Sequence, residues 1–154
     1  MFVILFMAFV AYFGVWNSGF VFDDFNHLVE NIHIHSLTPF SKFFLEPGVF
    51  VGDLEHPQNW RPAASLAGAV SWAVFGENPA GYHIVNLLLH LLNIGLVYLL
   101  AKNLFAGRRL AWLSALLFSV HPVLTESVTW IASQNNLLWT AFFLTACLLV
   151  QRKK

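Results

Sequence analysis

The stretch from Tyr82 to Ala101, YHIVNLLLHLLNIGLVYLLA, decides the fold class of this chain. It carries no Asp, Glu, Lys or Arg. Its length of about 20 residues is what an α-helix needs to cross the ~30 Å hydrocarbon core of a bilayer. We therefore predict a transmembrane helix over residues 81–102.

Polar residues in this stretch follow one face of the predicted helix. His83, Asn86, His90 and Asn93 step by three, four and three positions, so they lie within an arc of roughly 80°. One interpretation is hydrogen bonding to neighbouring helices, which is common in membrane bundles. The other is that the stripe lines a water-filled cavity, which makes His83 and His90 candidate substrate-binding residues.

The composition of the whole chain agrees with a membrane protein. Hydrophobic residues make up 58% of the 154 residues and charged residues only 10%, which lies outside the range of soluble globular proteins. The chain has no basic tract of the kind that binds nucleic acid. A single cysteine, Cys147, excludes a disulfide within the chain. We expect an all-α integral membrane protein.

Three further apolar runs complete the predicted bundle of about four spans. The run before His121 cannot cross alone, because about 11 residues cover only about 16 Å. His121 to Ser127 are therefore expected to line a cavity below the membrane surface. In the first outer loop, residues 19–80, we expect interfacial or re-entrant helices at Thr38–Leu45 and 62–75, with Phe40, Phe43 and Phe44 on one face of the first. The predicted spans are 1–18, 81–102, 110–122 and 137–150.

Charged residues are segregated along the chain. All eight acids fall on one side of these spans, and most of the eight bases fall in two short segments on the other. The positive-inside rule places the basic side, and with it both termini, in the cytoplasm. The acids are Asp23, Asp24, Glu30, Glu46, Asp53, Glu55, Glu77 and Glu126, and the segregated bases are Lys102, Arg108, Arg109, Arg152, Lys153 and Lys154.

Two adjacent carboxylates, Asp23 and Asp24, directly follow the first apolar run. Like charges side by side at an apolar boundary cost free energy unless a cation, a hydrogen-bond network or a substrate compensates. The pair either marks the end of the hydrophobic segment or belongs to a catalytic site. A divalent metal held by an aspartate with His27, His33 and His35 is a third interpretation.

Four motifs, in their order along the chain, resemble one protein family. Over nearly its whole length the sequence is similar to the membrane domain of the transmembrane and tetratricopeptide-repeat proteins. These resemble GT-C-fold glycosyltransferases that use polyprenyl-phosphate sugars, including protein O-mannosyltransferases. The resemblance implies a GT-C-like, multi-span bundle. The motifs are Phe22-Asp23-Asp24, Trp60-Arg61-Pro62, Asn78-Pro79-Ala80-Gly81-Tyr82-His83 and His121-Pro122-Val123-Leu124-Thr125-Glu126.

The resemblance implies that the first outer loop takes part in sugar transfer. In that superfamily a carboxylate of this loop is the base for the acceptor hydroxyl, a role that carries over onto Asp23 and Asp24. Arg61 is the candidate for the donor phosphate, because guanidinium matches phosphate geometry, and a lipid-headgroup contact is the alternative. His121 and Glu126 are candidates for the acceptor side, with ordinary loop polarity as the alternative. The implied partners are a polyprenyl-phosphate-linked sugar, a protein acceptor and membrane lipid, without nucleic acid and without a required cofactor.

The sequence departs from the family in two ways. Asn136 stands where many relatives carry an acidic residue before the fourth span. The chain also has fewer spans than the transferases and no helical repeat of about 34 residues. We therefore expect the amino-terminal part of a membrane glycosyltransferase, inactive in isolation. The alternative is a non-catalytic module that acts through another membrane protein. A bacterial inner membrane is favoured over the endoplasmic reticulum.

Overall fold

The computed structural model describes residues 1–54, 59–105 and 107–151. All regular elements in these ranges are helical, as the sequence predicts. The short 3₁₀ or π-helical turns are η1 (Phe13–Asn17), η2 (Phe25–Val29), η3 (Ile32–Ile34), η4 (Pro122–Leu124) and η5 (Ile131–Ser133). The α-helices are α1 (Phe2–Ala11), α2 (Lys42–Leu45), α3 (Pro62–Phe75), α4 (Pro79–Leu104), α5 (Arg108–Ser119), α6 (Thr125–Thr129) and α7 (Gln134–Gln151).

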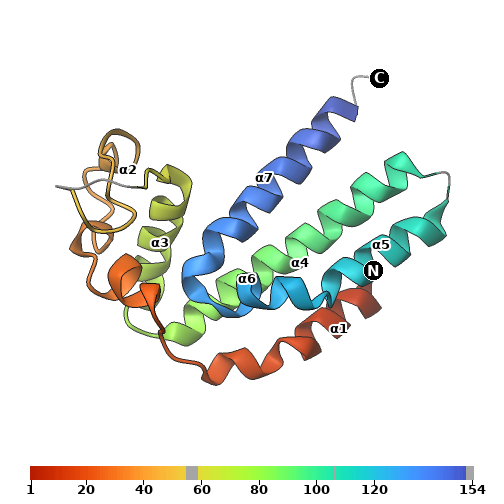
Figure 1. Ribbon diagram of the computed structural model, residues 1–154, viewed down its shortest axis with the longest axis horizontal. Helices are drawn as coiled ribbons and strands as arrows, with labels where there is room; N and C mark the ends of the chain where they lie inside the picture. Colours follow the sequence, from red (N-terminus) through yellow and green to blue (C-terminus); the bar gives the residue numbers. More distant parts are fainter. Residues whose placement is uncertain (55–58, 106, 152–154) are drawn as a thin grey trace.

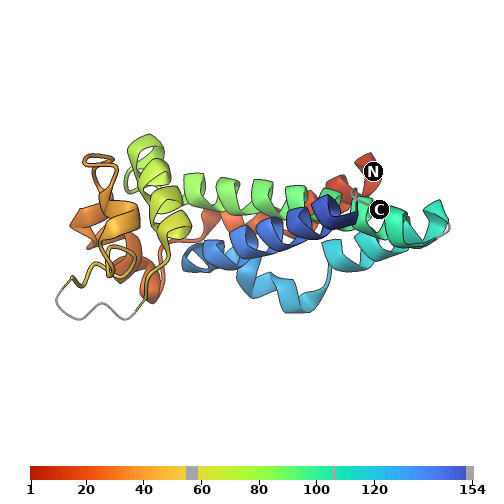
Figure 2. The ribbon, with the colours of Figure 1, turned by 90° about the horizontal axis from the view of Figure 1, so that it is seen from above.

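Helix α4 is the central element of the molecule (Figures 1 and 2). It begins where Asn78 caps it, because the Asn78 side-chain oxygen accepts a hydrogen bond from the Ala80 N–H at 3.2 Å. Pro79 suits the first turn, where its missing N–H has no consequence. Helices α1, α5 and α7 all pack against α4.

Among the described residues, α4 is the one helix long and apolar enough to cross a membrane by itself. Its 26 residues extend about 39 Å at ~1.5 Å per residue. Helix α5 and the segment Pro122–Thr129 pass the same test only as a pair, bent by 49°. The bend falls where Pro122 lacks a backbone N–H to continue α5. The apolar helices Phe2–Asn17 and α3 are shorter, so the described residues hold one or two candidate spans, against about four predicted.

The first outer loop, at the left-hand end of Figure 1, packs around a hydrophobic core that it shares with the start of α4 and with η5. Asn31 is buried beside this core and ties the loop together: its Nδ2 donates to the Val49 carbonyl at 2.8 Å, and its Oδ1 accepts from the His33 N–H at 3.2 Å. The loop is therefore ordered by burial as well as by its short helices. The buried core residues are Leu28, Ile34, Phe43, Val49, Ala69, Tyr82 and Ile131.

Helix α3 has the predicted bounds, and a tight turn joins it to α4. The Tyr82 hydroxyl donates to the Gly76 carbonyl at 2.8 Å, which holds the start of α4 against the end of α3. Gly81 lies under the ring of Phe75, and a Cβ at Gly81 would overlap that ring. The close approach of the two helices thus depends on a glycine at this position.

The predicted helix over Thr38–Leu45 is wrong at its start, because α2 begins only at Lys42. The Ser36 hydroxyl bonds both the N–H and the carbonyl of Thr38 at 3.1 Å, a local turn that competes with helix formation. The predicted shared face is also only partly correct. Phe43 is 1% exposed and packs into the core, whereas Phe40 and Phe44 remain 56% and 44% exposed.

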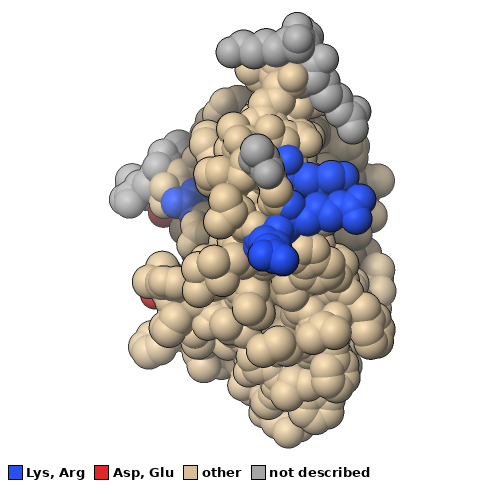
Figure 3. Space-filling model, turned by 90° about the vertical axis from the view of Figure 1, so that its right-hand side faces the viewer, with Lys and Arg blue, Asp and Glu red and all other residues tan. Residues whose placement is uncertain are grey.

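Basic residues gather at one end of the helices (Figure 3). Lys102 lies in the last turn of α4, and Arg108 and Arg109 begin α5. The first turn of α1 and the last turn of α7 lie toward this same end, and the first outer loop lies at the opposite end (Figure 1). For the described residues, the charge segregation in the sequence therefore corresponds to two ends of the folded chain. Four of the charged residues in that prediction lie outside the described residues: Glu55, Arg152, Lys153 and Lys154.

Candidate functional site

The two adjacent aspartates have different surroundings. Asp24 is fully buried, and each of its carboxylate oxygens accepts a backbone hydrogen bond. Oδ2 accepts from the Val21 N–H at 2.9 Å, and Oδ1 accepts from the Ala132 N–H at 2.7 Å. Asp24 thus fastens the turn after η1 to the segment that leads into α7.

Burial is the main cause that raises the pKa of the Asp24 carboxyl above its ordinary value. The N–H groups of Val21 and Ala132 oppose this shift, and the neighbouring charge of Asp23 adds to it. Asp24 therefore fastens the loop through its two hydrogen bonds, although burial disfavours the ionised form of its carboxyl group.

Asp23 is exposed, and its side chain makes no hydrogen bond to any residue in the described ranges. It follows Phe22, which has a left-handed backbone (φ 48°) and is 85% exposed. This conformation is uncommon for a bulky residue and costs about 1–3 kcal/mol. The turn, fixed by Asp24, presents Asp23 outward.

His27 lies one helical turn beyond Asp23, in η2. Its ring packs on Phe50, with the ring centroids 4.5 Å apart. Burial lowers the pKa of His27, while the charge of Asp23 raises it and that of Arg61 lowers it. The charges of Asp23 and Arg61 therefore both affect the pKa of His27. Because this pKa lies below the ordinary 6.5, the His27 ring is neutral at neutral pH.

Arg61 precedes α3 and is held on two sides. Its guanidinium carbon lies 4.9 Å from the centroid of the Phe50 ring, a cation–π contact. In the amide orientation that satisfies its neighbours, Asn135 accepts from Arg61 Nη1 at 2.7 Å and donates to the Ala132 carbonyl at 2.8 Å. The guanidinium is therefore positioned, and it remains half-buried.

An apolar groove begins at Arg61 and runs onto α7. Its volume is about 80 Å³, below the ~300–1,000 Å³ typical of sites that enclose a whole ligand, so it is a shallow groove that is open to the surroundings. Trp139 and Phe142 on its α7 side are 64% and 55% exposed. A cation at one end and apolar walls beyond it suit a phosphate with a hydrocarbon tail. The groove is lined by Arg61, Pro62, Ala63, Ala64, Asn135, Leu138, Trp139 and Phe142.

The polar stripe on α4 is buried, with exposures of 0–1%. Each member bonds a main-chain carbonyl of another segment, which is the interhelical hydrogen bonding of the first interpretation. A substrate-binding role for His83 and His90 stays a prediction. His83 Nε2 contacts Ser18 O at 3.3 Å, Asn86 Nδ2 donates to Trp130 O at 3.1 Å, His90 Nε2 contacts Ser119 O at 3.1 Å, and Asn93 Nδ2 donates to Leu137 O at 3.0 Å.

His121 and Glu126, the predicted acceptor-side residues, are both exposed. The His121 ring nitrogen Nδ1 accepts from the Val123 N–H at 3.2 Å and so caps η4. Glu126 shares an open hollow with Val21 and Phe22. It therefore lies beside the turn that presents Asp23, whereas His121 has a local structural contact.

The histidines of the first outer loop point to different partners. His35 stacks on Trp72 with ring centroids 3.6 Å apart, and its Nε2 contacts the Leu28 carbonyl at 2.8 Å. His27 instead packs on Phe50. In the part of the chain that the structure describes, no three His, Cys, Asp or Glu side chains are grouped so as to hold a metal ion.

The sequence-based prediction missed two residues of this site: Asn135, and His27 in any role other than metal binding. For Asn135 the one signal is its polarity at the start of the last apolar run, where the sequence analysis singles out only Asn136. Asn136 itself is exposed on α7. Asn135 and Arg61 lie 74 positions apart in the sequence (135 minus 61), and only the fold brings their side chains together.

Comparison with known proteins shows which family this chain is similar to. The family described as dolichyl-phosphate-mannose-protein mannosyltransferase matches residues 55–153. Protein O-mannosyl-transferase TMTC3 of Mus musculus is 32% identical over 144 residues, which cover 90% of this chain and 16% of that protein. Protein O-mannosyl-transferase Tmtc1 of Drosophila melanogaster is 31% identical over 148 residues, which cover 95% and 17%.

A third relative has a similar identity and coverage. Protein O-mannosyl-transferase TMTC1 of Mus musculus is 36% identical over 139 residues, 86% of this chain and 14% of that protein. The chain thus spans about one sixth of the length of these curated relatives. No solved structure matches it.

Proposed function

Because this chain belongs to the dolichyl-phosphate-mannose-protein mannosyltransferase family, we propose that it supplies the catalytic base and the phosphate-binding arginine of a membrane glycosyltransferase. The donor is a polyprenyl-phosphate-linked sugar, and the acceptor is a hydroxyl group of a protein. Since the chain spans about one sixth of its relatives, the activity belongs to the whole protein in which this segment functions.

The observation that carries the proposal is the setting of Arg61. Phe50 and Asn135 hold its guanidinium at the head of the apolar groove. A planar guanidinium binds phosphate oxygens through two parallel hydrogen bonds. The walls formed by Leu138, Trp139 and Phe142 then suit the isoprenoid chain that the phosphate carries.

Asp23 is the proposed base, since it is the exposed member of the carboxylate pair and its charge reaches His27 together with that of Arg61. Its carboxylate takes the proton of the acceptor hydroxyl as that oxygen bonds to the anomeric carbon. The bond from the anomeric carbon to the phosphate oxygen breaks, and the electron pair leaves with the polyprenyl phosphate. Arg61 stabilises the charge that develops on this leaving group.

The same proposal includes the membrane arrangement. We propose a GT-C-like bundle with about four spans in this segment, the first outer loop outside the cytoplasm and both ends of the chain inside. Lys102 in the last turn of α4 and Arg108 and Arg109 at the start of α5 support this arrangement, because basic residues gather at that end of the helices. The preference for a bacterial inner membrane stays a prediction, which fractionation of cells from the source organism tests.

The experiment is a transfer assay with the native protein in membranes, polyprenyl-phosphate-mannose as donor and a Ser/Thr-rich peptide as acceptor. We expect Arg61→Gln to lower transfer about 100-fold, the scale of losing one charge-stabilising group. Arg61→Lys should recover only part of the rate, because lysine restores the positive charge but not the planar pair of N–H donors of a guanidinium. Glu30→Gln, an exposed acid in the same loop, is the matched control. Full transfer by Arg61→Gln would contradict the assignment.

A second candidate is a non-catalytic module that acts through another membrane protein. The observation that favours it is the exposed apolar surface of α1 and α7, where Phe2, Phe6 and Phe143 are 80%, 57% and 68% exposed. Such faces need lipid or further helices to cover them. Co-purification of one stoichiometric partner, unchanged by Asp23→Asn and accompanied by no sugar transfer, would favour this candidate.

A further inference from the structure

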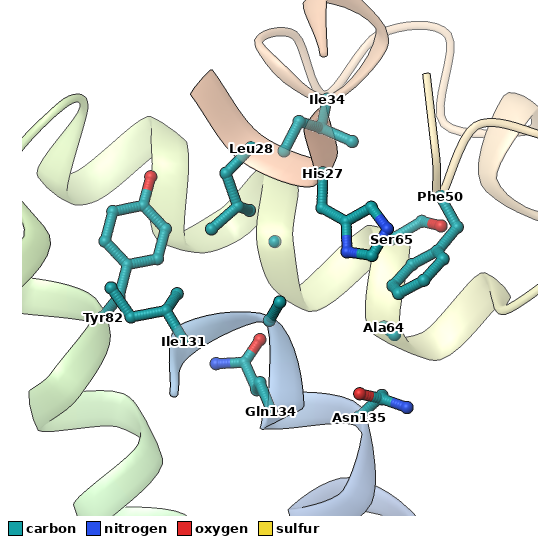
Figure 4. A pocket seen from close by; sticks show the side chains of 12 residues that line it. His27, Leu28, Ile34, Phe50, Ala64, Ser65, Tyr82, Ile131, Gln134 and Asn135 are labelled. Atoms are coloured by element: carbon teal, nitrogen blue, oxygen red, sulfur yellow. The ribbon is translucent and has the colours of Figure 1, made fainter. Parts of the chain in front are cut away.

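A small cavity lies between η2, α3 and the start of α7, next to the groove at Arg61 (Figure 4). It offers about 20 Å³ to the centre of a water-sized group, and one such group needs about 10–15 Å³. Its lining includes His27, Phe50, Ser65, Tyr82 and Gln134. The cavity therefore has room for a single small polar group.

Two polar atoms of this lining are buried without a hydrogen-bond partner in the described residues: His27 Nδ1 and Gln134 Nε2. Gln134 is only 8% exposed. The hydroxyls that also line the cavity are already engaged, Ser65 to the Arg61 carbonyl at 3.1 Å and Tyr82 to the Gly76 carbonyl at 2.8 Å. Buried polar groups are normally paired, so these two atoms offer hydrogen bonds to a small polar group in the cavity.

The chemistry of the two atoms defines that partner. The amide nitrogen of Gln134 is a donor, and Nδ1 of a neutral His27 accepts or donates according to the tautomer. A hydroxyl group both accepts and donates, so a single hydroxyl suits either tautomer. An ammonium group would lack the lone pair for Gln134.

We propose that His27 and Gln134 bind one hydroxyl group of the transferred sugar, and so form a sugar-recognition subsite beside Arg61. The inference rests on the proposed function, since the sugar reaches this cavity through the phosphate that Arg61 holds. Phe50 contacts both the His27 ring, at 4.5 Å, and the Arg61 guanidinium, at 4.9 Å. Asn135, which follows Gln134, bonds Arg61 at 2.7 Å. The residue proposed to bind the phosphate is therefore connected to the residues proposed to bind the sugar hydroxyl, through Phe50 and Asn135.

The test compares the binding of two lipids, polyprenyl-phosphate-mannose and polyprenyl phosphate, to the native protein in detergent. Gln134→Met and His27→Phe keep the approximate shape of each side chain and remove its hydrogen bond. We expect each to weaken binding of the mannose-bearing lipid about 2- to 10-fold, the effect of one hydrogen bond. Binding of polyprenyl phosphate should stay unchanged. Asn26→Ala, at an exposed position of the same turn, is the control.

Thermal unfolding of the same variants separates recognition from folding. Because the two atoms have no partner in the described structure, removing them should leave the Tm unchanged or raise it. Weaker binding of the mannose-bearing lipid at an unchanged Tm supports the subsite. Equal weakening of both lipids, or unchanged binding of both, overturns it.

Failure of the proposed function has a different signature. If the unsubstituted protein binds neither lipid, the donor assignment at Arg61 fails. Methyl mannoside, followed by saturation-transfer NMR, then tests the subsite alone. Binding that is lost in Gln134→Met supports the subsite, and the absence of binding to the unsubstituted protein overturns it.

Discussion

The carboxylate of Asp24 joins two segments that lie 108 positions apart, through the hydrogen bond from the Ala132 N–H. In Asp24→Asn one oxygen becomes an NH₂ group that faces a backbone N–H, so one hydrogen bond is replaced by two opposed donors. We expect a loss of about 1–3 kcal/mol in the free energy of unfolding, measured by thermal or denaturant unfolding in detergent. Asp23→Asn, at the exposed neighbour, should stay within about 0.5 kcal/mol. Equal stability of the two variants would show that Asp24 does not fasten the loop.

His27 predicts a pH dependence of stability. Burial lowers its pKa in the folded protein below the ordinary 6.5, so the unfolded chain takes up the proton first as the pH falls. The stability contribution of the neutral ring is therefore fully present above pH 6.5 and is lost as the pH falls from there through the folded pKa. Thermal unfolding across this range should show a smaller slope in His27→Phe. An unchanged slope would show that His27 does not cause the pH dependence in this range.

Among the elements, α4 offers a matched pair of glycines, Gly81 at its junction with α3 and Gly95 further along the helix. A methyl group at Gly81 would overlap Phe75, so Gly81→Ala should force the two helices apart and cost about 1–3 kcal/mol. Gly95, in the same helix, has no other atom within 4 Å of an added Cβ. Gly95→Ala should therefore be neutral or stabilise α4 by up to about 1 kcal/mol. Circular dichroism during heating measures both, and similar Tm values for the two variants would contradict the packing described here.

Elements were more predictable from sequence than the contacts between them. A run of about 20 residues without Asp, Glu, Lys or Arg identifies α4, and Pro62 with Gly76 brackets α3, because local sequence determines both. The late start of α2 depends on a turn made by the Ser36 hydroxyl, which propensity does not reveal. The stripe on α4 was recognised, but its partners are carbonyls such as Ser119 O that only the fold brings near.

The site was predictable only in part, for a related reason. The motifs draw attention to Asp23, Asp24 and Arg61, but nothing in an Asp-Asp pair tells which carboxylate is buried. That difference arises because the Ala132 N–H meets Asp24 alone. Gln134 and His27 likewise gain interest only from the cavity that they share.

In the whole molecule, we expect α4 to cross the membrane. Glu77 and Lys102 are exposed and lie at opposite ends of α4. In a Cys147→Ala background, Glu77→Cys should react with a membrane-impermeant maleimide in sealed, right-side-out vesicles. Lys102→Cys should react only after permeabilisation, because the basic end faces the cytoplasm. Labelling of both positions from one side would contradict a span over α4.

The central claim is that the exposed aspartate does the chemistry and the buried one holds it in place. The most direct measurement is the initial rate of mannose transfer by Asp23→Asn in the native protein, per folded molecule and beside Glu30→Gln. We expect a loss of about 10²–10⁴-fold, the usual contribution of a general base, with the Tm unchanged. Transfer at the rate of Glu30→Gln would contradict it and remove Asp23 from the reaction.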